Sequence, residues 1–307
     1  MSTQETAVTR YVVANGTKLA YRQLGLTSGI PLVMLMHFRY DDFVSIRSAT
    51  RGSPKLVIQV ADTSSVLLKN TDRDNSRSGN MDFWDPALIY ALAKSRPIVL
   101  LDNAGVGKSE GEIPTTLHGW AIHVIALLDA LNIHQIDLLG FSMGGGAAQH
   151  VALAAPEKVR KLILAGTRTS RTPNTVLGPR KIFYELAHSE TEEEFKAAFA
   201  LSFFNPSQHG KDAAEASWNR IFTRKDDRAP HLSPVLAKRQ TEAFSNFSVS
   251  SPENPYERIH ELRMPVFVAN GDQDLLIPTP NSFELAQLLP HAHLHIYPNS
   301  GHGFLYQ

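Results

Sequence analysis

The sequence contains no cysteine, which excludes disulfide bonds, thiolate metal sites and a cysteine nucleophile. It also lacks an excess of one charge, because 30 Lys and Arg residues balance 30 Asp and Glu residues. Nothing in this balance favours nucleic acid or an anionic membrane as a partner. No apolar run approaches the roughly 20 residues of a membrane span, and the polar N-terminus lacks the apolar core of a secretory signal. These absences predict a cytoplasmic globular protein.

What the 307 residues do contain is a regular alternation of apolar and amphipathic segments. Short apolar runs predict strands at 31–38, 97–105, 135–142, 159–167, 264–272 and 293–300. Apolar residues at helical spacing predict helices at 85–95, 117–133 and 143–155. Two strand-like halves around Asn15-Gly16 predict an N-terminal hairpin at 10–25. Because strands that alternate with helices pair in parallel, we predict an α/β fold, a three-layer sandwich with a mostly parallel sheet.

The alternation stops between residues 168 and 262, where helical segments occur without a convincing buried strand. We therefore expect a core formed by residues 1–167 and 263–307, with 168–262 as a helical cap over the sheet. A cap in this position is expected to select the substrate.

The strongest chemical signal is GFSMGGG at 140–146, between a predicted strand and a predicted helix. In a Gly-x-Ser-x-Gly turn the serine, here Ser142, has a strained conformation that exposes its hydroxyl. Gly140 and Gly144 are expected where the turn leaves no room for Cβ atoms, and the N–H of Met143 is expected to face an oxyanion. Taken alone, the motif also fits a glycine-rich helix start around a structural serine.

A serine nucleophile needs a base, and the base needs an acid that orients it. GDQDLLIP at 271–278 places Asp274 on the loop after one predicted strand, and NSGHGFL at 299–305 places His302 after another. Serine, aspartate and histidine then follow the chain order of an α/β-hydrolase triad. Asp272 competes for the role of the acid, but it lies nearer the strand and is expected to be structural.

With these motifs the chain resembles the α/β-hydrolase superfamily, in the group of esterases, lactonases and cofactor-free perhydrolases. DNAGVGKSEG at 102–111 resembles the D-x-x-G-x-G-x-S loop of the family, and HFR with GNMDFWDPALI at 79–89 resembles its oxyanion-loop region. The resemblance implies that Phe38 supplies a second oxyanion N–H beside Met143, and that no cofactor is needed. The serine separates the chain from dehalogenases and epoxide hydrolases with an aspartate nucleophile.

Weaker signals are open to two interpretations each. His37, Phe83 and Trp84 are candidates for a substrate pocket, although packed core residues of these types are common. His291, His293 and His295 share one face of a predicted strand and could bind a metal, but an exposed edge strand explains them equally well, and we predict no metal.

GVGKS at 105–109 is not a phosphate loop, because G-x-x-x-x-G-K-S requires glycine where Asp102 stands.

The chain departs from the family pattern in two places. Residues 40–78 separate HFR from Gly79-Asn80, and the chain ends five residues after His302, where similar hydrolases continue into a helix. We expect the second departure to leave the His302 loop beside a fraying terminus. Our hypothesis is that 40–78 is translated intron and that the C-terminus is shortened; the alternative is a genuine insertion that forms an additional lid.

The predicted function is a serine hydrolase that cleaves an ester, lactone or thioester of a small to medium apolar molecule through an acyl-enzyme. A cofactor-free perhydrolase, with hydrogen peroxide in place of water, is the alternative within enzymes. A non-catalytic ligand-binding member, or a defective one, is the alternative outside them. The natural substrate and the oligomeric state stay open.

Overall fold

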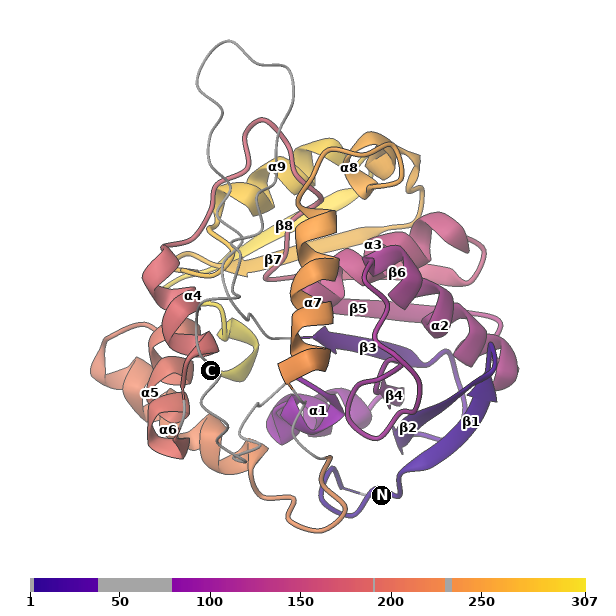
Figure 1. Ribbon diagram of the computed structural model, residues 1–307, viewed down its shortest axis with the longest axis horizontal. Coiled ribbons are helices and arrows are strands. Elements are labelled where there is room, and N and C mark those ends of the chain that lie inside the picture. The colour runs from indigo at the N-terminus through magenta and orange to yellow at the C-terminus, as the bar shows by residue number, and fades with distance from the viewer. Residues whose placement is uncertain (1–2, 38–78, 190, 230–233) are drawn as a thin grey trace.

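The computed structural model describes residues 3–37, 79–189, 191–229 and 234–307. Within them, eight strands form one sheet in the order β1-β2-β4-β3-β5-β6-β7-β8 (Figure 1). The strands are β1 (Arg10–Ala14), β2 (Thr17–Gly25), β3 (Leu32–His37), β4 (Pro97–Leu101), β5 (Ile136–Ser142), β6 (Val159–Ala165), β7 (Val266–Gly271) and β8 (Ala292–Tyr297). The segment 40–78, on which the intron hypothesis rests, lies outside the described residues.

The pairing of the strands confirms the predicted sheet. The N-terminal hairpin turns at Asn15-Gly16, and β2 also pairs antiparallel with β4. The remaining neighbours, from β4 through β3 to β8, pair in parallel. Parallel pairing brings the carboxyl ends of these strands to one edge of the sheet, where polar loop residues can meet.

Helices occupy most of the segments between the strands. They are α1 (Pro86–Ala93), α2 (Leu117–Ala130), α3 (Met143–Ala154), α4 (Arg180–Ala187), α5 (Glu192–Phe203), α6 (Gln208–Ile221), α7 (Pro234–Phe247), α8 (Pro255–Arg258) and α9 (Pro280–Leu288). Short 3₁₀ helices are η2 (Met81–Phe83), η3 (Ile259–Glu261) and η4 (Phe304–Tyr306). The helices predicted at 85–95, 117–133 and 143–155 are confirmed as α1, α2 and α3, whereas α9 was not predicted.

The sheet separates two apolar clusters, as a three-layer sandwich requires. Because side chains alternate along a strand, Val33 and Leu35 of β3 pack with α2, α3 and α9 on one face. Met34 and Met36 pack on the other face with α1. This second cluster continues into α4, α5, α6 and η4, so the helices that follow β6 share a core with the sheet.

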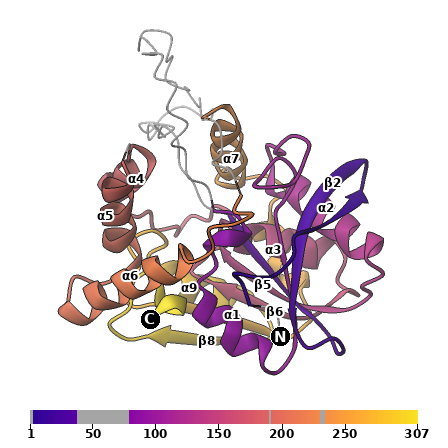
Figure 2. The same cartoon turned by 90° about the horizontal axis from the view of Figure 1, so that it is seen from below.

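The described part of 168–262 contains helices α4 to α8 and no strand. Figure 2 shows α4, α5 and α7 on one side of the sheet. The expected substrate-selecting cap would consist of these helices. No helix in the described ranges is both long and apolar enough to cross a membrane.

The end of the chain is packed, contrary to the expectation of a fraying terminus. Phe304 and Tyr306 of η4 are buried, and Phe304 stacks on Tyr297 of β8 with ring centroids 5.1 Å apart. The side chain of Gln307 accepts a hydrogen bond from the Ser300 hydroxyl at 2.7 Å. These contacts hold the loop that carries His302 against the core.

Helix α3 carries a buried histidine, His150, at its contact with two other helices. The ring of His150 lies 5.6 Å from that of His118 in α2 and 6.3 Å from that of Phe247 in α7. Burial, followed by the charges of His118 and Arg258, lowers the pKa of His150 to about 4. The packing of three helices beside the sheet therefore depends on a neutral imidazole.

Acid should weaken this packing. The unfolded chain binds the His150 proton more tightly, so this group's contribution to stability is complete above pH 6.5 and is lost as the pH falls toward 4. Between pH 7 and pH 5 we expect the free energy of unfolding of the wild type to fall by about 2 kcal/mol more than that of His150→Gln, measured by urea denaturation. The exposed His134 offers a control, since His134→Gln should keep the wild-type pH dependence. An unchanged pH dependence in His150→Gln would contradict the prediction.

Candidate active site

The turn between β5 and α3 gives Ser142 an unusual backbone. Its φ of 56° and ψ of −125° lie in the positive-φ region, outside the left-handed helical well, which a non-glycine residue adopts only under strain. Ser142 occupies the N-cap position of α3 but makes no side-chain cap hydrogen bond. Its hydroxyl therefore makes no hydrogen bond to the backbone of the helix, and Ser142 lines a pocket.

Two glycines make this turn sterically feasible. A Cβ atom on Gly144 would lie 2.2 Å from the Leu35 carbonyl oxygen of β3. A Cβ atom on Gly140 would lie 2.5 Å from the Gly144 carbonyl oxygen. Helix α3 therefore approaches the backbones of β3 and β5 at a distance that only glycine permits. The first helical residue, Met143, follows at once, and N–H groups in the first turn of a helix lack intrahelical partners.

Asp274 and His302 come together from the loops after β7 and β8. The His302 Nδ1 and the Asp274 Oδ2 are 2.7 Å apart, and both side chains are fully buried. The other carboxylate oxygen of Asp274 accepts the N–H groups of Leu276 and Ile277, each at 2.8 Å. The carboxylate is thus fixed by the backbone on one side and is free to orient the imidazole on the other.

The second imidazole nitrogen of His302 has a different environment. Among the described residues, Nε2 is buried and has no hydrogen-bond partner. The ring lies 4.8 Å from that of Phe141, the residue before Ser142. A buried nitrogen without a partner is costly to a folded protein unless it has another role.

Asp272, the competing acid, has a separate contact. Its Oδ1 accepts the N–H of Ser300 at 3.0 Å and so joins the β7 and β8 loops. The structure therefore brings Asp274, and not Asp272, to the imidazole of His302.

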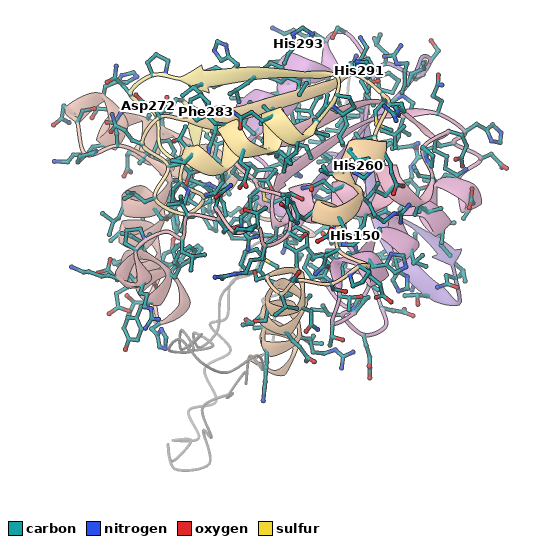
Figure 3. All side chains as sticks on the ribbon, turned by 90° about the horizontal axis from the view of Figure 1, so that it is seen from above. His150, His260, Asp272, Phe283, His291 and His293 are labelled. Atoms are coloured by element: carbon teal, nitrogen blue, oxygen red, sulfur yellow. The ribbon has the colours of Figure 1, made fainter. Side chains whose placement is uncertain are left out.

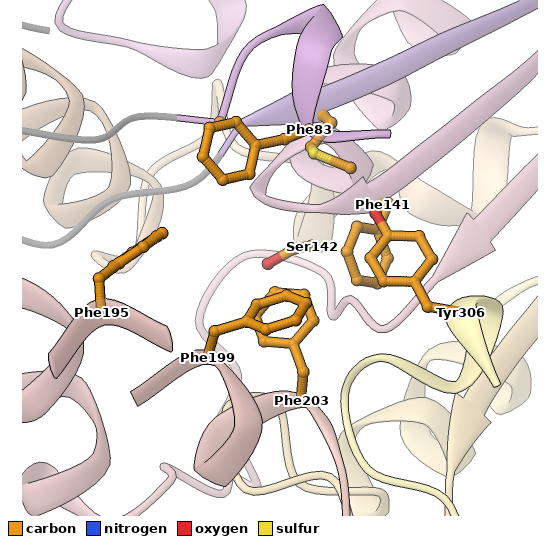
Figure 4. Close-up of a pocket in the computed structure, with 9 residues that line it drawn as sticks. Phe83, Phe141, Ser142, Phe195, Phe199, Phe203 and Tyr306 are labelled. Atoms are coloured by element: carbon orange, nitrogen blue, oxygen red, sulfur yellow. The ribbon is translucent and has the colours of Figure 1, made fainter. Parts of the chain in front are cut away.

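The pocket beside Ser142 is almost entirely aromatic (Figure 4). Its lining side chains come from strand ends, from η2, from α5 and from η4. They are Met36, Gly79, Phe83, Phe141, Ser142, Phe195, Phe199, Phe203 and Tyr306. No charged side chain is present among these described lining residues, so the pocket suits an uncharged apolar group.

The remaining predicted site residues have mixed positions. Phe83 lines the pocket, whereas Trp84 is buried behind it, with its ring 6.1 Å from that of Phe141. His37 pairs with Ser142 in the register of β3 and β5, which places its backbone beside the nucleophile turn. Phe38, the expected second oxyanion donor, lies outside the described residues.

The three histidines at 291–295 do not line the pocket. β8 is an edge strand, and His291 just before it and His293 and His295 within it are exposed; Figure 3 shows the first two at the periphery of the molecule. Within the described residues no three His, Cys, Asp or Glu side chains are placed to hold a metal ion.

Asp102, the first residue of the D-x-x-G-x-G-x-S motif, holds the loop of that motif together by hydrogen bonds. Its carboxylate accepts the Met81 N–H at 2.8 Å and the Lys108 N–H at 2.9 Å, and its carbonyl accepts the Ser109 hydroxyl at 2.7 Å. Burial raises the pKa of Asp102 to about 7, against the opposing effect of the two N–H donors. This residue thereby fixes the start of η2, from which Phe83 enters the pocket.

Most residues of the pocket wall were not predicted from the sequence. Phe195, Phe199 and Phe203 recur at intervals of four, which places them on one face of α5, and this spacing was a usable signal. Phe141 adjoins Ser142, the predicted nucleophile, so its position was also foreseeable. Nothing in the sequence distinguished Tyr306, because its place depends on how the last residues fold back onto the sheet.

Comparison with known proteins places this site in a family. A family model described as the alpha/beta hydrolase fold matches residues 76–307. An alpha/beta hydrolase fold protein from Chitinophaga pinensis is similar in structure, with a TM-score of 0.79 and 30% sequence identity over 99% of this chain and 94% of that chain. The chain belongs to the α/β-hydrolase fold family.

The relatives are hydrolases. The 2-hydroxymuconate semialdehyde hydrolase of Pseudomonas sp. (strain CF600) is 28% identical over 214 residues, which cover 69% of this chain and 71% of that protein. A 2-hydroxy-6-oxononadienedioate/2-hydroxy-6-oxononatrienedioate hydrolase of Paraburkholderia phymatum is 28% identical over 236 residues, with 73% and 76% covered. Esterase RhEst1 from Rhodococcus sp. ECU1013 shares the fold at 20% identity, with a TM-score of 0.64 over 97% and 93% of the two chains. The family and the two hydrolases of 28% identity support a hydrolase.

The contact between α3 and β3 can be tested at Gly144. A methyl group on this residue would overlap the Leu35 carbonyl, so Gly144→Ala must move the helix away from the strand. We expect the free energy of unfolding to fall by about 1–3 kcal/mol, measured by urea denaturation. A variant with wild-type stability would show that α3 does not approach β3 this closely.

Proposed function

We propose that the protein is a serine hydrolase in which Ser142, His302 and Asp274 form the catalytic triad. The observation that carries this proposal is the buried 2.7 Å contact between Asp274 and His302, whose remaining nitrogen has no partner among the described residues. A strained serine with a hydroxyl on an apolar pocket lies at the carboxyl end of β5, in the same parallel part of the sheet as β7 and β8. These are the groups that acyl transfer requires.

In the proposed mechanism, the unpartnered Nε2 of His302 takes the proton of Ser142 as its oxygen attacks the substrate carbonyl. Asp274 holds the imidazole in the tautomer that leaves Nε2 free and stabilises the imidazolium that forms. The N–H of Met143, at the start of α3, donates to the oxyanion, with that of Phe38 as the second donor. His302 then protonates the leaving group, and water cleaves the acyl-enzyme with His302 again as base.

The substrate proposed is an uncharged ester, lactone or thioester. Among the described lining residues no cation is available to pair with a carboxylate, and burying an unpaired charge costs several kcal/mol. The phenylalanines of α5 form much of the wall, so 168–262 is proposed as a cap that selects the substrate, over a core of 1–167 and 263–307.

Hydrolysis of a carbon–carbon bond beside a ketone is the second candidate, and the relatives favour it. The dienedioate named for the Paraburkholderia enzyme is a dicarboxylate. The uncharged lining of the described pocket argues against such a substrate here. Assays with p-nitrophenyl acetate and with a 2-hydroxy-6-oxodienedioate separate the two candidates.

Removal of the nucleophile tests the triad directly. Ser142→Ala should abolish turnover of p-nitrophenyl acetate, because no other group can form the acyl-enzyme, and should abolish labelling by a fluorophosphonate probe. Turnover is followed at 400 nm with the purified protein at about pH 7.5, and circular dichroism checks that the variant folds. Undiminished hydrolysis, or labelling at another serine, would refute the assignment.

The two aspartates after β7 form a matched pair for the acid. Asp274→Asn keeps the shape of the side chain but favours the wrong imidazole tautomer, so kcat should fall by about 10³- to 10⁴-fold. Asp272→Asn loses only part of a loop contact to Ser300, and its kcat should fall by less than about tenfold. Equal losses in the two variants would remove the basis for choosing Asp274.

A further inference from the structure

Among the described residues that line the aromatic pocket, Tyr306 has the one polar side chain besides that of Ser142, and the proposed triad does not use it. Tyr306 of η4 is only 4% exposed, and its ring lies beside Phe141 in the pocket (Figure 4). Its hydroxyl is fully buried and has no hydrogen-bond partner among the described residues. A buried donor left in this state destabilises the folded protein, so a ligand that pairs with it recovers that cost on binding.

The ring of Tyr306 is held firmly in place. It stacks on Phe203 of α5 with the planes 13° apart, and its centroid is 5.9 Å from that of Phe141. Its backbone carbonyl accepts a hydrogen bond from Arg220, whose guanidinium forms a two-pronged ion pair with Asp85 at 2.8 and 2.7 Å. The hydroxyl therefore cannot turn toward solvent without breaking the packing of α5 and α6 against the core.

The hydroxyl is also kept in its donor form. Burial, and then the negative charge of Asp85, raise the pKa of Tyr306 well above its ordinary value. The Asp85 carboxylate is occupied by Arg220 and by the N–H of Ala87, so it does not serve as the acceptor for the phenol. An acceptor oxygen on the substrate would give the Tyr306 hydroxyl its missing hydrogen-bond partner.

We propose that Tyr306 is a specificity-determining residue that donates a hydrogen bond to an oxygen atom on the acyl chain of the substrate. The preferred substrates are then uncharged esters whose acyl group carries a keto or ether oxygen, and not plain hydrocarbon chains. This proposal rests on the serine-hydrolase function proposed above. A site built to pair with a substrate oxygen discriminates against the analogue without it, because the buried hydroxyl is then left unpaired.

The test compares matched substrates and matched variants. Tyr306→Phe removes the hydroxyl and keeps the stacked ring, and Tyr297→Phe is the control, since that ring stacks on Phe304 and does not line the described pocket. The substrates are p-nitrophenyl 4-oxopentanoate and 5-oxohexanoate, with p-nitrophenyl pentanoate and hexanoate as their hydrocarbon counterparts.

We expect kcat/KM of Tyr306→Phe to fall about tenfold for at least one keto ester and to change less than about twofold for the plain esters. Tyr297→Phe should change neither. The thermal midpoint of Tyr306→Phe should equal or exceed that of the wild type, because an unpartnered buried hydroxyl is removed. Equal losses on keto and plain esters, or no loss on either keto ester, would overturn the proposal.

Binding separates this proposal from the triad. The affinities for acetophenone and for ethylbenzene can be measured by calorimetry even if the protein cleaves none of the esters. A failure to cleave the esters would contradict the proposed hydrolase function but not the role of the Tyr306 hydroxyl in binding. The wild type should prefer acetophenone over ethylbenzene about tenfold more strongly than Tyr306→Phe does. Equal preferences in the two proteins would overturn the role of the hydroxyl.

Discussion

The contact of helix α3 with the backbones of β3 and β5 is the constraint on which the site depends. Gly140 and Gly144 let the helix approach to a distance that any Cβ atom would prevent. The chain can then reverse from strand to helix only through a residue with a positive φ, and that residue is Ser142. The strain at the serine is therefore sustained by ten buried residues of α3, from Met143 to Ala152, and not by the serine itself.

Carboxylates buried around the same edge of the sheet fix the loops that complete the site. Asp102 binds the backbone of η2 and of its own loop, while Asp82 pairs with Arg22 and accepts the N–H of Ala229. Asp85 caps α1 and pairs with Arg220 of α6. Buried ion pairs contribute less to stability than their Coulomb energy suggests, because desolvation offsets it. Their effect here is geometric, since the Asp85–Arg220 ion pair joins α6 to α1 and the hydrogen bond from Ala229 to Asp82 joins the 168–262 region to η2.

The fold and the proposed triad were predictable because both depend on local patterns in a fixed order. Buried parallel strands appear as short apolar runs, and each proposed triad residue follows such a run, so their shared edge could be inferred without distances. The register of the strands then brings Asp274 within 2.7 Å of His302. Asp274 and His302 each follow the end of a strand within a few residues, so their loops are short enough to keep both side chains near the same edge of the sheet.

The pocket wall was less predictable, because it depends on how separate segments pack. The phenylalanines of α5 show their helical spacing, but that spacing does not say which part of the sheet they face. The residues after His302 were expected to fray, whereas Phe304 and Tyr306 fold back into the apolar cluster. Helix α9 was missed because its sequence, PNSFELAQL, has few apolar residues at helical spacing.

Two kinds of environment make up the proposed site, and their contrast would limit what it binds. On one side, the buried Asp274–His302 pair would stabilise the charge that develops in the proposed transition state. On the other, five phenylalanines offer contact area but no compensation for a charged group. A ligand that enters this pocket would therefore have to be uncharged, because a charged group would lose its hydration without gaining a partner. Its polar atoms would have to form hydrogen bonds with the few polar groups of the described lining. In the described pocket these partners are the serine and the Tyr306 hydroxyl, so the aromatic wall makes a single buried hydrogen bond count heavily in selection.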